Sequence, residues 1–119
     1  MSLHYGMTLA LRDDPALVER YKEHHRHVWP EVVARLHELG IRQMQIFLHR
    51  RQLFLWMETV DGFNPERDFA RLVEDERYRE WDALMRTMQE PVPDARPGEW
   101  WASMELVFDL KWQEPPTDE

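Results

Sequence analysis

The chain of 119 residues contains no cysteine, which excludes disulfide bonds, thiolate nucleophiles and thiolate metal sites. Its four glycines are too few for the glycine-rich loops that bind nucleotide phosphates. The longest purely apolar run, LFLWM at residues 53–57, is far below the roughly 20 residues that span a bilayer. Its 15 basic residues are outnumbered by 23 acidic ones, and the resulting net charge of −8 argues against a nucleic-acid partner. We therefore expect a cytoplasmic protein that binds neither nucleic acid nor membrane.

What the chain does contain is the composition of one globular domain. Hydrophobic residues make up 43% and charged residues 32% of a length that is sufficient for one core and too short for two. We expect a single domain over residues 1–111 and a disordered tail over 112–119, which is rich in proline and acidic residues. The six tryptophans are either large core side chains or flat apolar walls for a ring-shaped ligand.

Hydrophobic periodicity predicts the order of the secondary-structure elements. Strand patterns occur over 5–11, 41–49, 52–60 and 101–111, and helical patterns over 15–26, 30–39, 65–74 and 76–89. Asp14-Pro15 and Asn64-Pro65 are typical helix starts, and residues 91–99 form a proline-rich loop. The resulting β-α-β-β-α-β order predicts an α+β fold, a ferredoxin-like sandwich. Because helices cover one face of such a sheet, we expect a second copy to cover the other face in a homodimer.

The stretch VERYKEHHRHVWPE at residues 18–31 contains three histidines in four positions. On a helix, Tyr21 and His25 lie above one another on one face, and Trp29 would continue this row if the helix persisted beyond its break at Pro30. His24 is about 100° and His27 about 200° away from His25, so the three imidazoles do not converge. A metal bound by His24 and His27 would need a third ligand from elsewhere, and we predict no metal site here.

The face that carries Tyr21, His25 and Trp29 is the candidate site for proton transfer. Imidazole has an unperturbed pKa of roughly 6.5, which suits it to give and take protons near neutral pH. The alternative for His25 is a hydrogen-bonded histidine at the edge of the core. Glu58 and Glu105 interrupt apolar strands and are further candidates as a general base or as partners of sugar hydroxyls, although solvent-facing positions explain both.

Three groups of residues, spread over about residues 5–111, together match the pattern of a known family. They are Tyr21-x3-His25-x3-Trp29-Pro30-Glu31 with the following Gly40, the helix residues Arg79-x-Trp81 with Met85 and Met88, and the ending Val107-Phe108-x-Leu110. This combination resembles the L-rhamnose mutarotase family.

The resemblance implies a dimeric α+β barrel that interconverts the α and β anomers of a 6-deoxy sugar without a cofactor or a metal. It implies that His25 is the proton donor and that Tyr21 contacts the sugar. The family's tandem tryptophan falls at Glu80 and Trp81, and a tyrosine of the family falls at Met44. Because these two positions differ from the family pattern, L-fucose is expected as a monosaccharide substrate as well as L-rhamnose.

The expected substrate-binding residues are Tyr21, Trp29, Met44, Glu80 and Trp81. Two other classes of function stay open at this point. One is a non-catalytic sugar-binding or regulatory dimer. The other is a cofactor-free monooxygenase or a haem-degrading enzyme, because this barrel hosts several chemistries.

Overall fold

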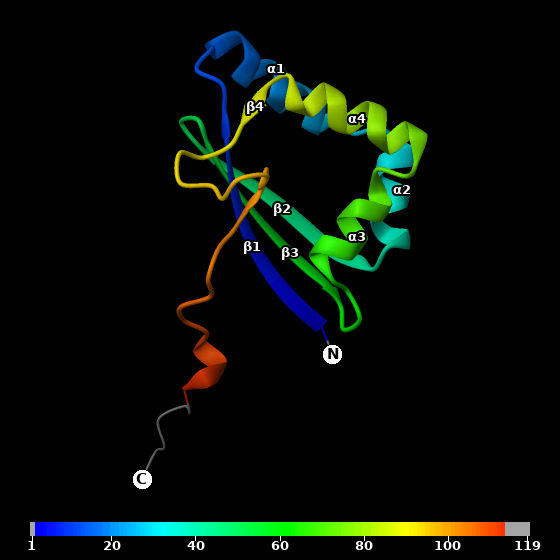
Figure 1. Ribbon diagram of the computed structural model, residues 1–119, viewed down its shortest axis with the longest axis vertical. Helices are drawn as coiled ribbons and strands as arrows, with labels where there is room; N and C mark the ends of the chain where they lie inside the picture. The colour runs from blue at the N-terminus through cyan, green and yellow to red at the C-terminus, as the bar shows by residue number, and fades with distance from the viewer. Residues whose placement is uncertain (1, 114–119) are drawn as a thin grey trace.

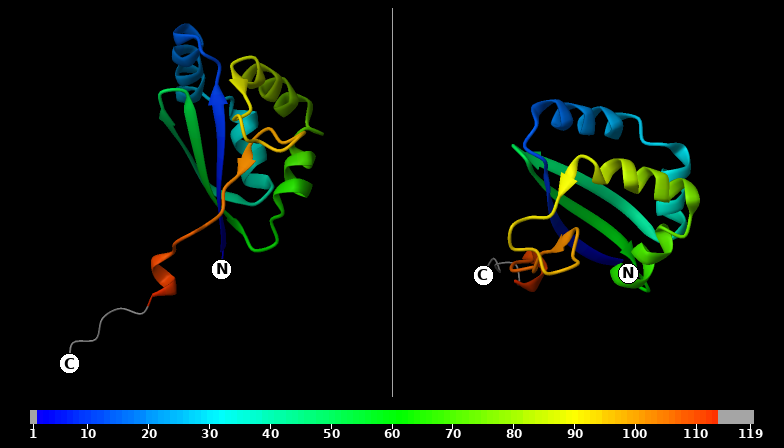
Figure 2. Two further views of the ribbon diagram at one scale, coloured as in Figure 1. Left: turned by 60° about the vertical axis from the view of Figure 1, so that its left-hand side comes forward. Right: turned by 45° about the horizontal axis from the view of Figure 1, so that its top comes forward.

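The computed structural model describes residues 2–113, in which one antiparallel sheet carries all the α-helices on one face (Figures 1 and 2). The elements in chain order are β1 (Ser2–Leu11), α1 (Pro15–Arg26), α2 (Pro30–Glu38), β2 (Ile41–His49), β3 (Gln52–Val60), α3 (Pro65–Leu72), α4 (Glu76–Arg86), β4 (Gln89–Glu90), β5 (Ala102–Ser103) and the 3-10 helix η1 (Leu110–Trp112). Within residues 2–113, no helix has the length and apolar character to cross a membrane. Most of the predicted tail, residues 114–119, lies outside the described residues.

The sheet has the strand order β2-β3-β1-β4, and β5 also pairs with β1. Its central strands are β1 and β3, which run antiparallel with Met7 opposite Leu55, while Leu55 in turn faces Ile46 of β2. This topology confirms the predicted ferredoxin-like α+β fold. The alternation of side chains along each strand therefore directs one set of apolar residues toward the helices.

Local sequence signals explain where the helices begin and end. The Asp14 side chain accepts a hydrogen bond from the Ala16 N–H at 2.9 Å, and Asn64 accepts one from Arg67 N–H at 3.1 Å. After α2, Gly40 has a φ of 99°, a backbone conformation that residues with a Cβ rarely adopt. A Cβ at that position would also lie 2.6 Å from Val60 Cγ2, so this turn requires glycine.

The core lies between the sheet and the helices. Its completely or almost completely buried side chains come from both layers and include Leu9, Leu11, Met57, Leu72 and Met88. The opposite face of the sheet carries no helix (Figure 2), and Phe47 and Phe54 remain 55% and 37% exposed there. The sheet thus has one buried face and one face, with exposed aromatic residues, that is open within the single chain.

The predicted last strand over 101–111 is wrong for most of its length. Only Ala102 and Ser103 pair with β1, and Met104 N–H makes one more hydrogen bond to Gly6 O at 2.9 Å. The chain then leaves the sheet (Figure 1), and Leu110 enters η1. An alternating pattern forms a strand only beside a neighbour that completes its ladder, and after Met104 this segment no longer pairs with β1. The helices α3 and α4 also end earlier than predicted, and β4 was not predicted.

Candidate active site

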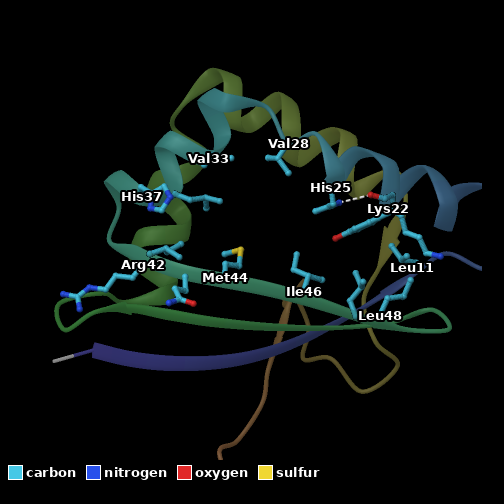
Figure 3. A pocket seen from close by; sticks show the side chains of 15 residues that line it. Leu11, Lys22, His25, Val28, Val33, His37, Arg42, Met44, Ile46 and Leu48 are labelled. Atoms are coloured by element: carbon cyan, nitrogen blue, oxygen red, sulfur yellow. Dashed lines mark hydrogen bonds between the residues drawn. The ribbon is translucent and has the colours of Figure 1, made fainter.

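Two neighbouring cavities of about 460 and 320 Å³ lie between the helices and the inner face of the sheet. The larger one opens between α1, α2 and β2 (Figure 3). Six residues line both cavities: Tyr21, His25, Val28, Leu36, Met44 and Ile46. Most of this shared wall is aliphatic, so the phenol and the imidazole are its polar groups. The sequence-predicted pair therefore lies where the two cavities meet.

Helix α1 holds Tyr21 and His25 in a fixed mutual geometry. Their rings are stacked at 4.2 Å between centroids and 9° between planes, as the i, i+4 spacing predicts. His25 Nδ1 lies 2.8 Å from the backbone carbonyl oxygen of Tyr21. Because a carbonyl oxygen only accepts, Nδ1 must carry the proton in this contact. In the neutral ring Nε2 then holds a lone pair, and His25 offers a proton acceptor to the cavity (Figure 3).

Burial controls the protonation of both groups. Loss of solvation lowers the pKa of His25 below 6.5; the hydrogen bond to the Tyr21 carbonyl raises it, and the nearby His24 lowers it further. At pH 7 this imidazole is therefore neutral. Burial raises the pKa of Tyr21 to about 12, although the hydrogen bond from Gln89 lowers it. The Tyr21 phenol thus keeps its proton and acts as a donor.

The two predicted tryptophans occupy different layers around His25. Trp81 is 6% exposed, lines the smaller cavity and meets the His25 ring edge-on at 5.7 Å between centroids. Trp29 packs against Trp81 at 5.1 Å and lines neither cavity. The Arg77 guanidinium covers the ring of Trp29 at 3.7 Å. Trp81 is in position to touch a ligand, whereas Trp29 supports Trp81 from behind.

The remaining predicted site residues are also separated by the fold. Met44 lines both cavities from β2. Glu80 is exposed, makes an ion pair with Arg77 at 3.0 Å and lines neither cavity. The alternative carboxylates Glu58 and Glu105 line neither cavity as well. Of the predicted set, Tyr21, His25, Met44 and Trp81 therefore gather around one space.

The other two histidines of the stretch line neither cavity. His27 is exposed and lies 3.6 Å from Glu23, while His24 meets the edge of Trp81 at 6.2 Å. Among the residues that the structure describes, no group of three or more His, Asp or Glu side chains is arranged to hold a metal ion. The separation of His24 and His27 from His25 agrees with the helical geometry.

Sequence reasoning missed a polar contact at the inner end of the smaller cavity. Gln89 of β4 is 4% exposed, and its Nε2 lies 3.3 Å from the Tyr21 hydroxyl. Its Oε1 accepts a hydrogen bond from Trp100 Nε1 at 2.9 Å. A glutamine beside a proline-rich loop carries no pattern that marks it as part of a site. The amide reaches Tyr21 only because the chain folds β4 next to β1.

Comparisons with known proteins identify the family of this chain. A model of the L-rhamnose mutarotase family matches residues 4–110. An L-fucose mutarotase of Xanthomonas campestris pv. campestris is 38% identical, over 86% of this chain and 83% of the relative. A UPF0734 protein of Dictyostelium discoideum is 41% identical, over 91% of this chain and 90% of the relative. The crystal structure of an L-rhamnose mutarotase from Formosa agariphila superimposes with a TM-score of 0.67 at 23% identity, covering 90% of this chain and 97% of that one. The chain belongs to the L-rhamnose mutarotase family.

Proposed function

We propose that the protein is an aldose mutarotase, an isomerase that interconverts the α and β anomers of a 6-deoxy sugar. The observation that carries this proposal is the stacked Tyr21–His25 pair in the otherwise apolar wall that the two cavities share. The pair combines a protonated phenol with a neutral imidazole, a donor and an acceptor side by side. Membership of the family and the names of the relatives support the same reaction.

The chemistry needs one proton to leave the anomeric hydroxyl and one to reach the ring oxygen. His25 Nε2 accepts the proton of the anomeric hydroxyl while the bond between C1 and the ring oxygen breaks and the C1 carbonyl forms. The Tyr21 hydroxyl donates to the ring oxygen as it leaves. Rotation about the C1–C2 bond and reversal of these transfers close the other anomer. His25 is thus the acceptor in ring opening and becomes the donor in ring closure. Each such group contributes roughly 10²–10⁴-fold to a rate.

The proposed substrate is an L-fucose-type or L-rhamnose-type sugar, and L-fucose is the first to test. The 38% identical relative is an L-fucose mutarotase, and Met44 stands on the cavity wall at the position where the family resemblance predicts a tyrosine. Val28, Leu36 and Ile46 offer an aliphatic surface to the methyl group of a 6-deoxy sugar. Trp81 supplies an aromatic wall for the C–H face of the ring.

The test is anomer exchange measured by saturation-transfer NMR over L-fucose, L-rhamnose and other common aldoses. We expect the wild type to accelerate exchange and His25→Ala to lose roughly 10²–10⁴-fold of that acceleration. His27→Ala, which changes an exposed histidine on the same helix, is the matched control and should retain the wild-type rate. A wild type that binds sugar in calorimetry without accelerating exchange would identify a non-catalytic sugar-binding protein instead.

We further propose that the outer face of the sheet is covered by a second copy of the chain. Support comes from its exposed Phe47 and Phe54 and from the segment that follows β5, whose large apolar side chains are mostly more than half exposed: Met104, Leu106, Val107, Phe108, Leu110 and Trp112. Contiguous apolar surface of this kind is typical of interfaces. The alternation in this segment suits a strand that completes its ladder on the partner.

Light scattering coupled to size-exclusion chromatography tests the dimer. The wild type should have twice the 14.6 kDa mass of the chain, and Phe54→Glu should reduce the mass to that of one chain. Ala34→Glu, which adds the same charge on an exposed position of α2, should leave the dimer intact. A monomeric wild type would contradict this part of the proposal and leave the reaction untouched.

A further inference from the structure

A chain of contacts leads from the surface of α4 to the hydroxyl of Tyr21. The Arg86 guanidinium is bonded to Asp82 at 2.9 Å and lies over the Trp100 ring at 4.5 Å. The Trp100 indole N–H then donates to Gln89 Oε1 at 2.9 Å, and Gln89 Nε2 faces the Tyr21 hydroxyl at 3.3 Å. Gln89 and Tyr21 are each 4% exposed, so water competes little for these bonds.

The direction of both hydrogen bonds of the Gln89 amide follows from the indole N–H of Trp100. An indole N–H only donates, so the Gln89 atom that faces Trp100 must be the carbonyl oxygen. The amide nitrogen of Gln89 must then face Tyr21 and donate to its hydroxyl oxygen. Since that hydroxyl accepts from Gln89, its own proton cannot point back along the same line. Within residues 2–113, no other side chain or backbone group is bonded to the Tyr21 hydroxyl.

We infer that Gln89, held in its orientation by Trp100, is a positioning residue that directs the Tyr21 hydroxyl proton into the cavity toward a bound sugar. This inference rests on the proposed function, and it explains how the second proton carrier is prepared. Without Gln89, the Tyr21 O–H could rotate freely and would satisfy itself with water or with a ligand hydroxyl other than the ring oxygen. The same bond stabilises negative charge on the phenol as its proton departs.

The first test compares Gln89→Leu with Tyr21→Phe and with the double variant. We expect Gln89→Leu to lower kcat/KM about tenfold, mostly through kcat, as the loss of one neutral hydrogen bond predicts. In the Tyr21→Phe background the same change should have less than about a twofold effect, because there is no hydroxyl left to orient. Gln52→Leu removes an exposed glutamine from β3 and is the matched control with wild-type activity. Equal activity of Gln89→Leu and wild type would overturn the inference. So would a double variant whose loss of kcat/KM equals the product of the two single losses.

Gln89→Glu tests the direction of the bond with almost no change in size. Once ionised, the new carboxylate only accepts, so it would draw the Tyr21 proton away from the cavity. We expect this variant to be slower than wild type at pH 8 and to lose activity further as pH rises, whereas the wild-type rate is constant there. A Gln89→Glu rate equal to that of wild type from pH 6.5 to 9 would contradict the proposed orientation.

A readout that is independent of turnover separates this inference from the proposed function. With tyrosine labelled at ¹³Cζ, the Tyr21 signal is assigned by its loss in Tyr21→Phe. It should shift at pH 7 in Gln89→Leu and in Trp100→Phe, and stay unchanged in Gln52→Leu. Trp100→Phe keeps an aromatic ring under Arg86 and removes only the N–H donor. Unshifted signals in both variants would refute the inference even if the wild type is a mutarotase. A wild type without exchange activity but with these shifts would refute the function alone.

Discussion

The pH dependence of anomer exchange tests whether His25 works from its neutral form. Burial places the pKa of this imidazole below 6.5, so its Nε2 is available as an acceptor throughout the neutral range. The enzymatic rate, corrected for the spontaneous reaction in the same buffer, should be constant near pH 8, where the imidazole is neutral. Below the pKa of His25 it should fall about tenfold for each further pH unit, in proportion to the neutral fraction.

His24 provides a way to move this profile without touching the cavity pair. The Coulombic effect of His24 is one of the causes that lower the pKa of His25. His24→Gln should therefore shift the fall in rate toward higher pH and leave the plateau rate unchanged. The ring protons of His25, followed by NMR titration, should shift by the same amount as the kinetic profile. His27→Gln, two positions after His25 and exposed, should move neither curve.

The opposite profile would refute the acceptor role. If the rate rose as pH fell from 8 to 6, the protonated imidazole would be the active form, and its Nε2 would donate a proton to the sugar instead of accepting one. The stability of the fold gives an independent check of the sign. Because the pKa of His25 is lower in the folded than in the unfolded chain, the unfolded state binds more protons below pH 6.5. The free energy of unfolding should therefore decrease as pH falls from 6.5 toward the folded-state pKa.

Three further predictions concern stability and are checked by thermal and denaturant unfolding. Gly40→Ala should cost at least about 1–2 kcal/mol, because φ is 99° there and the new Cβ would lie 2.6 Å from Val60 Cγ2; a neutral effect would mean that α2 and β3 shift freely. Arg50→Gly should stabilise the β2–β3 turn by about 0.5–1 kcal/mol, because Arg50 has a φ of 56°; a loss of stability would show that its side chain matters more than its backbone. Asp68→Asn should cost about 1–2 kcal/mol at pH 7, because Asp68 is buried, accepts the Asn64 N–H at 2.8 Å and pairs with Arg67 at 2.9 Å. Since these contacts lower the pKa of Asp68, the difference from wild type should shrink as pH falls below 3.8, and a difference that persists in acid would exclude the charge as its cause.

Local sequence patterns were sufficient to predict most of the helices and strands and the proximity of Tyr21 and His25. The cap-and-proline pairs before α1 and α3 and the alternation in β1 and β3 predicted those elements, because capping and side-chain alternation are short-range effects. The stacking of Tyr21 on His25 also follows from helical spacing alone. The same geometry separated His24 and His27 from that pair.

What only the tertiary structure decided depends on contacts between distant segments. Helical spacing alone did not predict that Glu80 lies on the surface. Its side chain faces outward because Trp81, the next residue, occupies the buried face of α4. Gln89 reaches Tyr21 across 68 positions of sequence because β4 pairs with β1, and no periodicity records that pairing. The segment after Ser103 has the alternation of a strand, but a strand also needs a neighbour to complete its hydrogen bonds, and within one chain β1 provides that neighbour only as far as Met104. Helices and their faces are determined by neighbours within one or two turns. The contact of Gln89 with Tyr21 and the early end of the last strand depend instead on which backbone segments lie side by side.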